Sequence, residues 1–340
     1  MRALVTGGGG FLGQAIVGRL LAEGHEVTVL GRSDYPELAS RGVRCVRGDV
    51  ADRGAAMEAV RGHDVVFHAA AKAGIWGDRS DFVRTNVAGT ESVIAGCLAH
   101  GVSRLVHTSS PSVVFDGSDQ KDVATDPGYP ARYECDYPET KAQAERLVLA
   151  ANGPRLASVA LRPHLIYGPR DPHLLPRVFE RARRRRLVVV GDGRNLVSLT
   201  YVDNAAAAHT QAAARLRPGA PFAGRAYFVN DDEPVRLWDW LSRLLERLGL
   251  PSIGRRVPLG LARAAGALLE TLWATLSLPG EPAMTRFLAS QLALSHSYSV
   301  RPAQEAFGYT PLVSGDDGFE RTATWWRERL ASGCPSTALR

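Results

Sequence analysis

The sequence predicts an α/β protein built on a doubly wound parallel sheet, followed by a smaller and mostly helical lobe. In the first half, short β-branched runs alternate with amphipathic helical segments, which is typical of a parallel sheet covered by helices on both faces. A glycine-rich turn separates the first run from the first helical segment. Beyond residue 165 the alternation becomes irregular. We expect residues 1–165 to form the sheet domain, with 200–230 packing back on it, and residues 166–340 to form the second lobe.

The apolar pattern locates the elements of this first domain. Helices are predicted at 11–22, 82–99 and 138–151. Strands are predicted at 2–6, 26–30, 43–47, 64–68, 103–108 and 157–162. Sheets of this kind bind ligands beyond the carboxyl ends of their strands, at the point where the strand order reverses. The loops after the strands are therefore where functional residues are expected.

Composition indicates a globular cytoplasmic protein. Of 340 residues, 45% are hydrophobic and 22% are charged, which is ordinary for a soluble domain. The four cysteines (Cys45, Cys97, Cys135 and Cys334) form no CxxC pair, and an apolar strand begins almost at residue 1. We therefore expect reduced thiols and no signal peptide. No His/Cys/Asp cluster has the spacing of metal ligands, so no metal is expected.

The positive charge consists almost entirely of arginine. The formal net charge is +6, yet only Lys72, Lys121 and Lys141 are lysines among the 41 basic residues. The run "RARRRR" at 181–186 is the one candidate for binding nucleic acid or anionic lipid. No RNA-binding aromatic motif or zinc module accompanies it. We read it as a solvated helix end and expect no nucleic-acid partner.

The turn "TGGGGFLG" predicts a dinucleotide-binding site of the Rossmann type. Gly7 permits a tight turn, Gly10 lets a pyrophosphate approach the backbone, and Gly13 lets helix and strand pack closely. The helix that starts at Phe11 and Leu12 then directs free N–H groups and a positive dipole at the phosphates. The context supports this reading because a strand precedes the glycines and a helix follows them.

The end of the second predicted strand discriminates between cofactors. A carboxylate there would hold the adenine ribose, but the sequence has Gly31, Arg32 and Ser33. A guanidinium and a hydroxyl in this place suit a 2′-phosphate, which predicts NADPH/NADP+. Asp34 is the rival feature, because it could bend back to the ribose and restore NAD binding.

The segment "YPETK" supplies a candidate acid–base pair. Tyr137 and Lys141 are four residues apart and share one face of a helix whose first turn accommodates Pro138. A free tyrosine has a pKa of about 10. The Lys141 charge, the helix dipole and a cationic nicotinamide could each lower it. We therefore predict that Tyr137 and Lys141 are catalytic, and that Lys141 also binds the cofactor.

Together these motifs resemble the extended short-chain dehydrogenase/reductase family over nearly the whole chain. The resemblance implies that Asp49 and Val50, in "GDVAD", contact the adenine. It implies that Ala69 and Ala70, in "VVFHAAA", line the cofactor. It also implies that Pro163, in "LRPHLIYGP", flanks the nicotinamide.

The same resemblance gives roles to three further polar residues and leaves one open. Ser110, in "HTSSPSVV", takes the position of the catalytic serine that donates to the substrate carbonyl, and Ser109 is the adjacent candidate. Asn86 matches an asparagine that props strand 4 open, with a helix-interior polar contact as the alternative. His164 is either a site residue or a surface histidine.

Later motifs narrow the substrate. "YVDNAAAAH" and "FGYTPLVSGDDGFERT" resemble the 3β-hydroxysteroid dehydrogenase branch of the family. Within it, "HAAAKAGIWGDRSDF" and "HTSSPSV" resemble bacterial reductases of olefin biosynthesis, which reduce 2-alkyl-3-oxoalkanoic acids with NADPH. The alternatives are a 3β-hydroxysteroid or sterol dehydrogenase and a non-catalytic NADP-sensing regulator. The resemblance also implies a homodimer formed through 82–99 and 138–151.

Two features bear on a hydrophobic acidic substrate. Lys72 follows strand 4, where it could pair with a substrate carboxylate, shape the pocket entrance or simply be a solvated loop lysine. Residues 258–280 are the most apolar segment, but Arg263 and Glu270 interrupt them, so no uncharged stretch reaches the roughly 18 residues that span a bilayer. The segment reads as a buried helix pair, a lid, a partner-docking face or a membrane-surface contact.

Overall fold

The computed structural model, which describes residues 1–231 and 233–332, contains a seven-stranded parallel sheet. Its order is β12-β7-β5-β4-β1-β2-β3. The order reverses between β1 and β4, so their carboxyl ends flank the expected ligand position. The strands are β1 (Arg2–Thr6), β2 (Glu26–Gly31), β3 (Arg44–Arg47), β4 (Val65–His68), β5 (Arg104–Thr108), β7 (Ala157–Pro163) and β12 (Ala226–Val229). The predicted fold class and the six predicted strands are confirmed.

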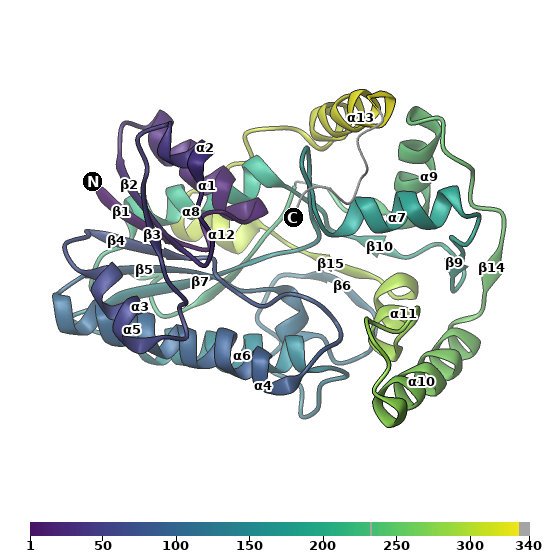
Figure 1. The fold of residues 1–340 in the computed structure, drawn as a ribbon, viewed down its shortest axis with the longest axis horizontal. Helices are drawn as coiled ribbons and strands as arrows, with labels where there is room; N and C mark the ends of the chain where they lie inside the picture. The colour runs from purple at the N-terminus through teal and green to yellow at the C-terminus, as the bar shows by residue number, and fades with distance from the viewer. Residues whose placement is uncertain (232, 333–340) are drawn as a thin grey trace.

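Helices cover both faces of this sheet (Figure 1). One face carries α1 (Phe11–Ala22), α8 (Val202–Arg215) and α12 (Arg301–Phe307), and the other carries α3 (Arg53–Val60), α5 (Gly89–His100) and α6 (Asp136–Ala150). The strands are buried on both sides, which explains why they read as continuous apolar runs. Arg19 in α1 donates to Thr210 in α8 at 2.6 Å, so α8 is fixed to the first domain.

The helical segment predicted at 82–99 is longer and less regular than expected. It begins with α4 (Arg79–Phe82), passes through a π-helical turn at Val83–Ala88 and continues as α5. The wider turn buries Thr85 and Asn86. Such π-turns occur mostly at functional sites, and sequence periodicity does not reveal them.

A second sheet and core lie beside the first domain. The second sheet has the order β13-β10-β15-β6, formed by β6 (Gln120–Val123), β10 (Leu196–Val197), β13 (Val235–Arg236) and β15 (His296–Tyr298). Two short pairs join β8 (Ile166–Tyr167) to β11 (Thr200–Tyr201) and β9 (Val189–Val190) to β14 (Arg256–Val257). The helices of this part are α7 (Leu174–Arg183), α9 (Leu237–Arg247), α10 (Leu259–Leu276), α11 (Arg286–Ala293) and α13 (Gly315–Ala331). A short helix of the first domain, α2 (Pro36–Ala39), follows β2.

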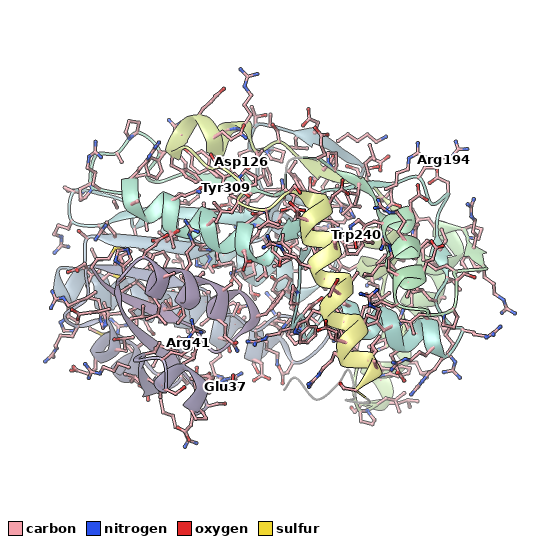
Figure 2. The ribbon with its side chains drawn as sticks, turned by 90° about the horizontal axis from the view of Figure 1, so that it is seen from above. Glu37, Arg41, Asp126, Arg194, Trp240 and Tyr309 are labelled. Carbon is pink, nitrogen blue, oxygen red and sulfur yellow. The ribbon has the colours of Figure 1, made fainter. Side chains whose placement is uncertain are left out.

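The two parts of the molecule do not divide cleanly at residue 165, because segments from each side of that position pack with the other part. β6 comes from before that position and joins the second sheet, whereas β12 and α12 come from after it and pack with the first domain. Figure 2 shows Glu37 and Arg41 on the side of the first strands, with Trp240 and Arg194 on the other side. Trp240 belongs to a second hydrophobic core, separate from the core that contains Tyr309.

The reading of 258–280 as a buried helix pair is wrong. The segment forms one helix, α10, in which only Ala262 and Gly266 are buried. Four of its leucines face solvent instead: Leu261, Leu268, Leu272 and Leu276 are 62%, 70%, 40% and 61% exposed. Within the described residues, no helix combines the length and the apolar composition needed to cross a bilayer.

The structure describes three of the four cysteines. Cys45, Cys97 and Cys135 are free thiols. Cys334 lies outside the residues that the structure describes.

Candidate active site

The glycine turn forms a cradle into which side chains would not fit. Gly7 has φ +70°, and a Cβ built on it would lie 2.8 Å from the Ala70 main chain. A Cβ on Gly13 would lie 2.1 Å from the Gly7 carbonyl oxygen. The Gly10 N–H donates to that same oxygen at 2.9 Å, and α1 begins immediately afterwards at Phe11 and Leu12. The free N–H groups at this helix start suit a pyrophosphate.

Ala69 and Ala70 complete the cradle from the side of β4. The Ala69 N–H donates to the Thr6 carbonyl at 3.2 Å, and the Ala70 N–H to the Thr6 hydroxyl at 3.3 Å. The predicted strand 4 turn therefore lies directly against the glycine turn.

The predicted adenine-contacting segment carries an unexpected cation. Asp49 accepts hydrogen bonds from the Ala51 N–H at 3.0 Å and from Arg84 at 2.7 Å. Burial by itself would raise the pKa of Asp49, but these bonds outweigh it and hold the pKa below its usual value. Val50 is buried against Gly89. Arg84 is distant from Asp49 in the sequence, so no local motif revealed it.

An aromatic ring occupies the space left by the missing side chain at position 31. A Cβ on Gly31 would lie 2.4 Å from the Tyr35 hydroxyl, and a Cβ on Gly9 would overlap the Tyr35 ring. Arg32 and Ser33 are exposed beside it. The rival residue Asp34 has an 83% exposed side chain and lies 3.9 Å from Arg47 at the end of β3. Tyr35 belongs to no motif that would have singled it out.

A cleft of about 300 Å³ leads from Arg32 toward the second lobe. Its lining includes Lys72, Asp81, Arg84 and His173. The Lys72 ammonium donates to Asp81 at 2.6 Å and lies 5.2 Å from the centre of the Phe82 ring. Lys72 is thus a partly buried residue at the wall of this cleft, held there by its pairing with Asp81.

The Tyr137 hydroxyl lies close enough to Ser110 for the serine side chain to affect its ionisation. Ser110 precedes a 3₁₀ turn at Pro111–Val114, where its Oγ accepts from the Ser112 N–H at 3.2 Å. Burial raises the pKa of Tyr137, and the Ser110 side chain opposes this increase. The lowered tyrosine pKa that the sequence suggested does not occur in the protein alone. The cost of burying a phenolate dominates there.

Lys141 faces the end of β5. Its ammonium donates to the Thr108 carbonyl at 2.5 Å and lies 3.4 Å from His107 Nε2. The side chain is buried, and burial lowers the pKa of Lys141 to about 8, against an opposing effect of Glu145. Burial also lowers the pKa of His107, so His107 is neutral and accepts from the ammonium. Sequence reasoning missed His107, although it directly precedes Thr108 at the strand end.

Asn86 connects β4 to the catalytic helix. Its Oδ1 accepts from the Lys72 N–H at 2.7 Å, and its Nδ2 donates to the Lys72 carbonyl at 3.2 Å. Nδ2 also donates to Thr140 in α6 at 3.1 Å. The main-chain bonds are those that the predicted propping role requires, and the helix contact is present as well.

The remaining predicted residues lie around the end of β7. Pro163 is its last residue. His164 is buried, so the surface reading is wrong; its Nδ1 bonds to the Ser198 carbonyl at 2.6 Å and its ring centre lies 4.8 Å from that of His296. Burial lowers the pKa of His164 to about 3. Ser109 is also buried; its N–H donates to the Leu161 carbonyl at 2.6 Å, and its hydroxyl has no partner among the described residues.

Comparison with known proteins identifies the family. The sequence profile of the 3-beta hydroxysteroid dehydrogenase/isomerase family matches residues 4–259, which is more than half of the chain. The chain belongs to this family. The predicted branch and the oxidoreductase class, acting on CH–OH or C=O, are thereby confirmed.

Three relatives show the range of similarity to this member of the 3-beta hydroxysteroid dehydrogenase/isomerase family. The chain is 49% identical to a 2-alkyl-3-oxoalkanoate reductase of Stenotrophomonas maltophilia, over 94% of this chain and 98% of that protein. It is 46% identical to one of Shewanella oneidensis, over 94% and 84%. A human sterol-4-alpha-carboxylate 3-dehydrogenase is more distant, at 37% identity over 96% and 88%.

A solved structure bears on the cofactor of this family member. The dTDP-glucose 4,6-dehydratase of Streptomyces venezuelae, determined with NAD, superposes with a TM-score of 0.75 at 26% identity and covers 98% of both chains. The glycine turn of this chain suits the same class of ligand, because Gly7 and Gly13 let the turn pack tightly against neighbouring main chain and α1 begins immediately after Gly10 with free N–H groups. The prediction of a nicotinamide dinucleotide cofactor is thus confirmed.

Proposed function

We propose that this protein reduces a long-chain 2-alkyl-3-oxoalkanoic acid to the 2-alkyl-3-hydroxyalkanoic acid with NADPH, as a step of olefin biosynthesis. The observation that carries the proposal is the bond from Lys141 to the Thr108 carbonyl, which fixes α6 against the end of β5. This contact holds Tyr137, one helical turn before Lys141, near Ser110. The names of the two most similar bacterial relatives described above support the choice of substrate.

The site residues divide the chemistry among them. Ser110 and Tyr137 lie near each other, so we propose that both hydroxyls donate to one carbonyl oxygen. Tyr137 keeps its proton near neutral pH because burial raises its pKa, and that proton passes to the oxygen of the new alcohol. The dihydronicotinamide, when bound, supplies the hydride. Lys141 places a positive charge one turn away, which stabilises the phenolate that remains.

The choice of NADPH rests on the tip of β2. Arg32 and Ser33 are exposed there, and Arg84 brings a second guanidinium to the same cleft. Two carboxylates lie near the tip, and both face other cations: Asp34 lies toward Arg47, and Asp49 accepts from Arg84 at 2.7 Å. These groups favour a 2′-phosphate over bare ribose hydroxyls.

The substrate is tested by comparing two ketones. NADPH oxidation is measured with a long-chain 2-alkyl-3-oxoalkanoic acid and, side by side, with a 3-ketosteroid. We expect turnover of the keto acid. Turnover of the steroid alone would contradict the proposal and favour the sterol dehydrogenase alternative.

Enzyme and regulator are separated by Tyr137→Phe. An enzyme loses turnover by roughly 10²-fold or more but keeps cofactor binding, because only the proton donor is removed. Tyr133→Phe is the matched control, since that hydroxyl only donates to the Val113 carbonyl at 3.0 Å. No turnover in the wild-type protein or in either variant, with cofactor binding retained in all three, would support a non-catalytic NADP-sensing protein.

The substrate contacts remain proposals for Lys72, Ser109 and His164. Lys72 is already paired with Asp81. We therefore propose that the two residues shape the entrance of the cleft, and that Lys72 does not bind the substrate carboxylate by itself. Lys72→Ala should therefore change KM for the keto acid more than kcat. We also propose a cytoplasmic homodimer that pairs through α5 and α6, which sedimentation would test.

A further inference from the structure

The outward face of α10 is apolar along its whole length. Leu261, Leu268, Leu272 and Leu276 follow the i, i+7, i+11, i+15 pattern that places residues on one helix face, and all four are exposed. We call these four residues the leucine stripe. The helix has 18 residues and is therefore about 27 Å long. A contiguous apolar surface of this kind marks an interaction site.

The inner side of α10 is already bound to the protein. Arg263 donates to Glu134 at 2.6 Å, and Glu270 accepts from the Arg286 side chain and main chain, each at 2.7 Å. Gly266 packs so closely on Thr285 that a Cβ there would lie 2.7 Å from its carbonyl carbon. Both charged residues of α10 are thus engaged inward. The helix cannot turn to bury the leucine stripe without breaking these contacts.

Exposed arginines adjoin the start of α10. Arg255 and Arg256 lie at β14, which leads directly into the helix. The Val189 N–H donates to the Arg255 carbonyl at 2.9 Å, so the pairing of β9 with β14 brings the end of the 181–186 run to the same place. We call five exposed residues near this place the arginine cluster: Arg183, Arg185, Arg186, Arg255 and Arg256. Within residues 1–231 and 233–332, none of the five forms an ion pair, whereas the neighbouring Arg184 pairs with Glu180.

We propose that α10 docks on the surface of an anionic lipid bilayer, with the leucine stripe in the interface and the arginine cluster at the headgroups. An apolar helix face combined with basic residues is what binds such surfaces. Charge complementarity selects this occupant, because a second copy would bring another arginine cluster to the contact. The stripe also lacks the polar groups that fix the orientation of a protein partner.

The docked helix would lie close to the catalytic residues. Arg263 ties α10 to Glu134, which directly precedes Cys135, the residue that caps α6 ahead of Tyr137. Docking itself does not depend on the identity of the substrate. Its consequence, that long alkyl chains enter from the bilayer, rests on the proposed function.

Flotation with vesicles tests the leucine stripe. The full-length protein should float with phosphatidylcholine vesicles that contain phosphatidylglycerol, less so at high salt, and only weakly with pure phosphatidylcholine. Leu268→Glu combined with Leu272→Glu should lower the partition coefficient by roughly tenfold or more, since burial of two leucines is lost. Leu312→Glu is the matched control, because Leu312 is 51% exposed but lies in the loop before α13.

The arginine cluster is tested separately. Arg185→Glu with Arg186→Glu should remove the preference for phosphatidylglycerol. The melting temperature and the NADPH-dependent reduction of a short soluble ketone should be unchanged in all these variants, which separates a docking defect from a failure of the proposed function.

Three results would overturn the proposal. The first is a wild-type protein that does not float with the anionic vesicles. The second is a control variant that loses binding as much as the stripe variant. The third is a stripe variant that floats normally but dissociates in sedimentation, because the stripe would then join two copies of the chain.

Discussion

Lys141 is the residue whose ionisation should limit activity at alkaline pH. Burial lowers its pKa to about 8, whereas burial raises the pKa of Tyr137, so Lys141 loses its proton first. The charge is present below that pKa and absent above it. We therefore expect kcat/KM for ketone reduction to be flat below pH 8 and to fall by about tenfold per pH unit well above it.

Lys141→Arg provides the control for this pH profile. An arginine stays charged throughout the range, so the alkaline decline should move to higher pH even if the maximum rate is lower. Steady-state kinetics across pH measure both proteins. A decline at the same pH in the two proteins would show that another group is responsible.

Arg32 should set the preference between the two cofactors. Arg32→Ala removes a charge-assisted hydrogen bond worth about 1.5–3 kcal/mol, so the NADPH/NADH ratio of kcat/KM should fall by roughly tenfold to a hundredfold. Asp34→Ala is the matched control, because Asp34 is close in sequence but lies toward Arg47. The cofactor assignment fails if Arg32→Ala leaves the ratio unchanged, or if Asp34→Ala lowers NADH use, because Asp34 would then be holding the ribose.

At the scale of elements, the packing of α1 requires a glycine at position 13, because main-chain atoms leave no room there for a side chain. A Cβ at Gly13 would meet the Gly7 carbonyl oxygen at 2.1 Å and the Gly8 Cα at 2.7 Å. Both are main-chain atoms and cannot move aside. Gly13→Ala should therefore lower the free energy of unfolding by about 1–3 kcal/mol and weaken cofactor binding.

Gly18 offers a control within the same helix. A Cβ there has only Arg41 within reach, at 3.5 Å. Gly18→Ala should raise the free energy of unfolding by about 0.5–1 kcal/mol, because alanine loses less conformational freedom. Chemical denaturation and cofactor titration compare the two variants, and similar losses at both positions would argue against the close approach at Gly13.

Sequence patterns predicted the elements that depend on local periodicity and missed those set by packing. The buried strands of the first sheet follow directly from β-branched runs, and the glycine cradle from a local motif. The π-turn that buries Asn86 has no periodic signature. The prediction of a buried helix pair at 258–280 was wrong because apolar residues usually face a core, whereas the leucine stripe of α10 faces solvent. Arg84, Tyr35 and His107 join the site through contacts with distant parts of the chain, which one sequence does not show.

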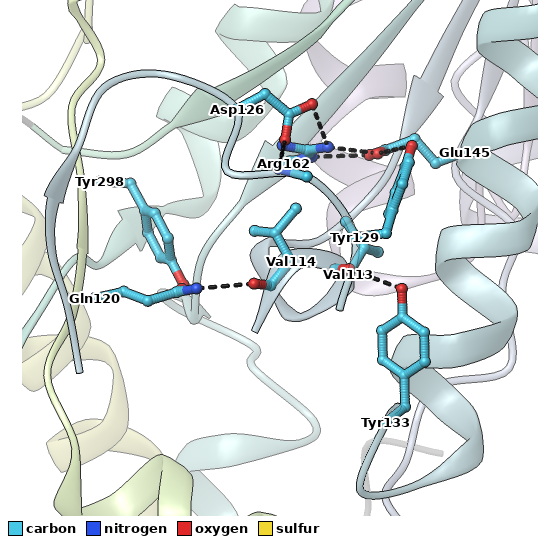
Figure 3. Close-up of polar contacts among 10 residues, drawn as sticks. Val113, Val114, Gln120, Asp126, Tyr129, Tyr133, Glu145, Arg162 and Tyr298 are labelled. Carbon is cyan, nitrogen blue, oxygen red and sulfur yellow. Dashed lines mark hydrogen bonds and ion pairs between the residues drawn. The ribbon is translucent and has the colours of Figure 1, made fainter. Parts of the chain in front are cut away.

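At the scale of the whole molecule, a buried ion pair joins α6 to β7 of the first sheet (Figure 3). Arg162 in β7 has no exposed side-chain surface and donates to Glu145 of α6 at 2.6 and 2.9 Å. It also contacts Asp126 at 3.2 Å and lies 5.2 Å from the centre of the Phe228 ring in β12. That ring stacks on Tyr298 of β15 in the second sheet. Arg162 is therefore a joint between the two parts of the molecule.

The Arg162–Glu145 pair is also connected to the candidate active site through α6. Glu145 is four residues beyond Lys141 and eight beyond Tyr137, so the three share one face of α6. Tyr129, in the loop that leads to α6, donates to Glu145 at 2.8 Å. Loss of Arg162 should consequently disturb both stability and the placement of the catalytic residues.

Arg162→Met tests this joint because it leaves Glu145 buried without its cation. We expect the free energy of unfolding to fall by about 3–5 kcal/mol, since an unpaired buried charge is costly. Asp126→Asn should cost at most about 1 kcal/mol, because Asp126 is 46% exposed and water can replace the contact. Adding Glu145→Gln to Arg162→Met removes the stranded charge and should restore part of the loss. Chemical denaturation measures all three variants. Equal costs for Arg162→Met and Asp126→Asn would mean that the two sheets are held together elsewhere.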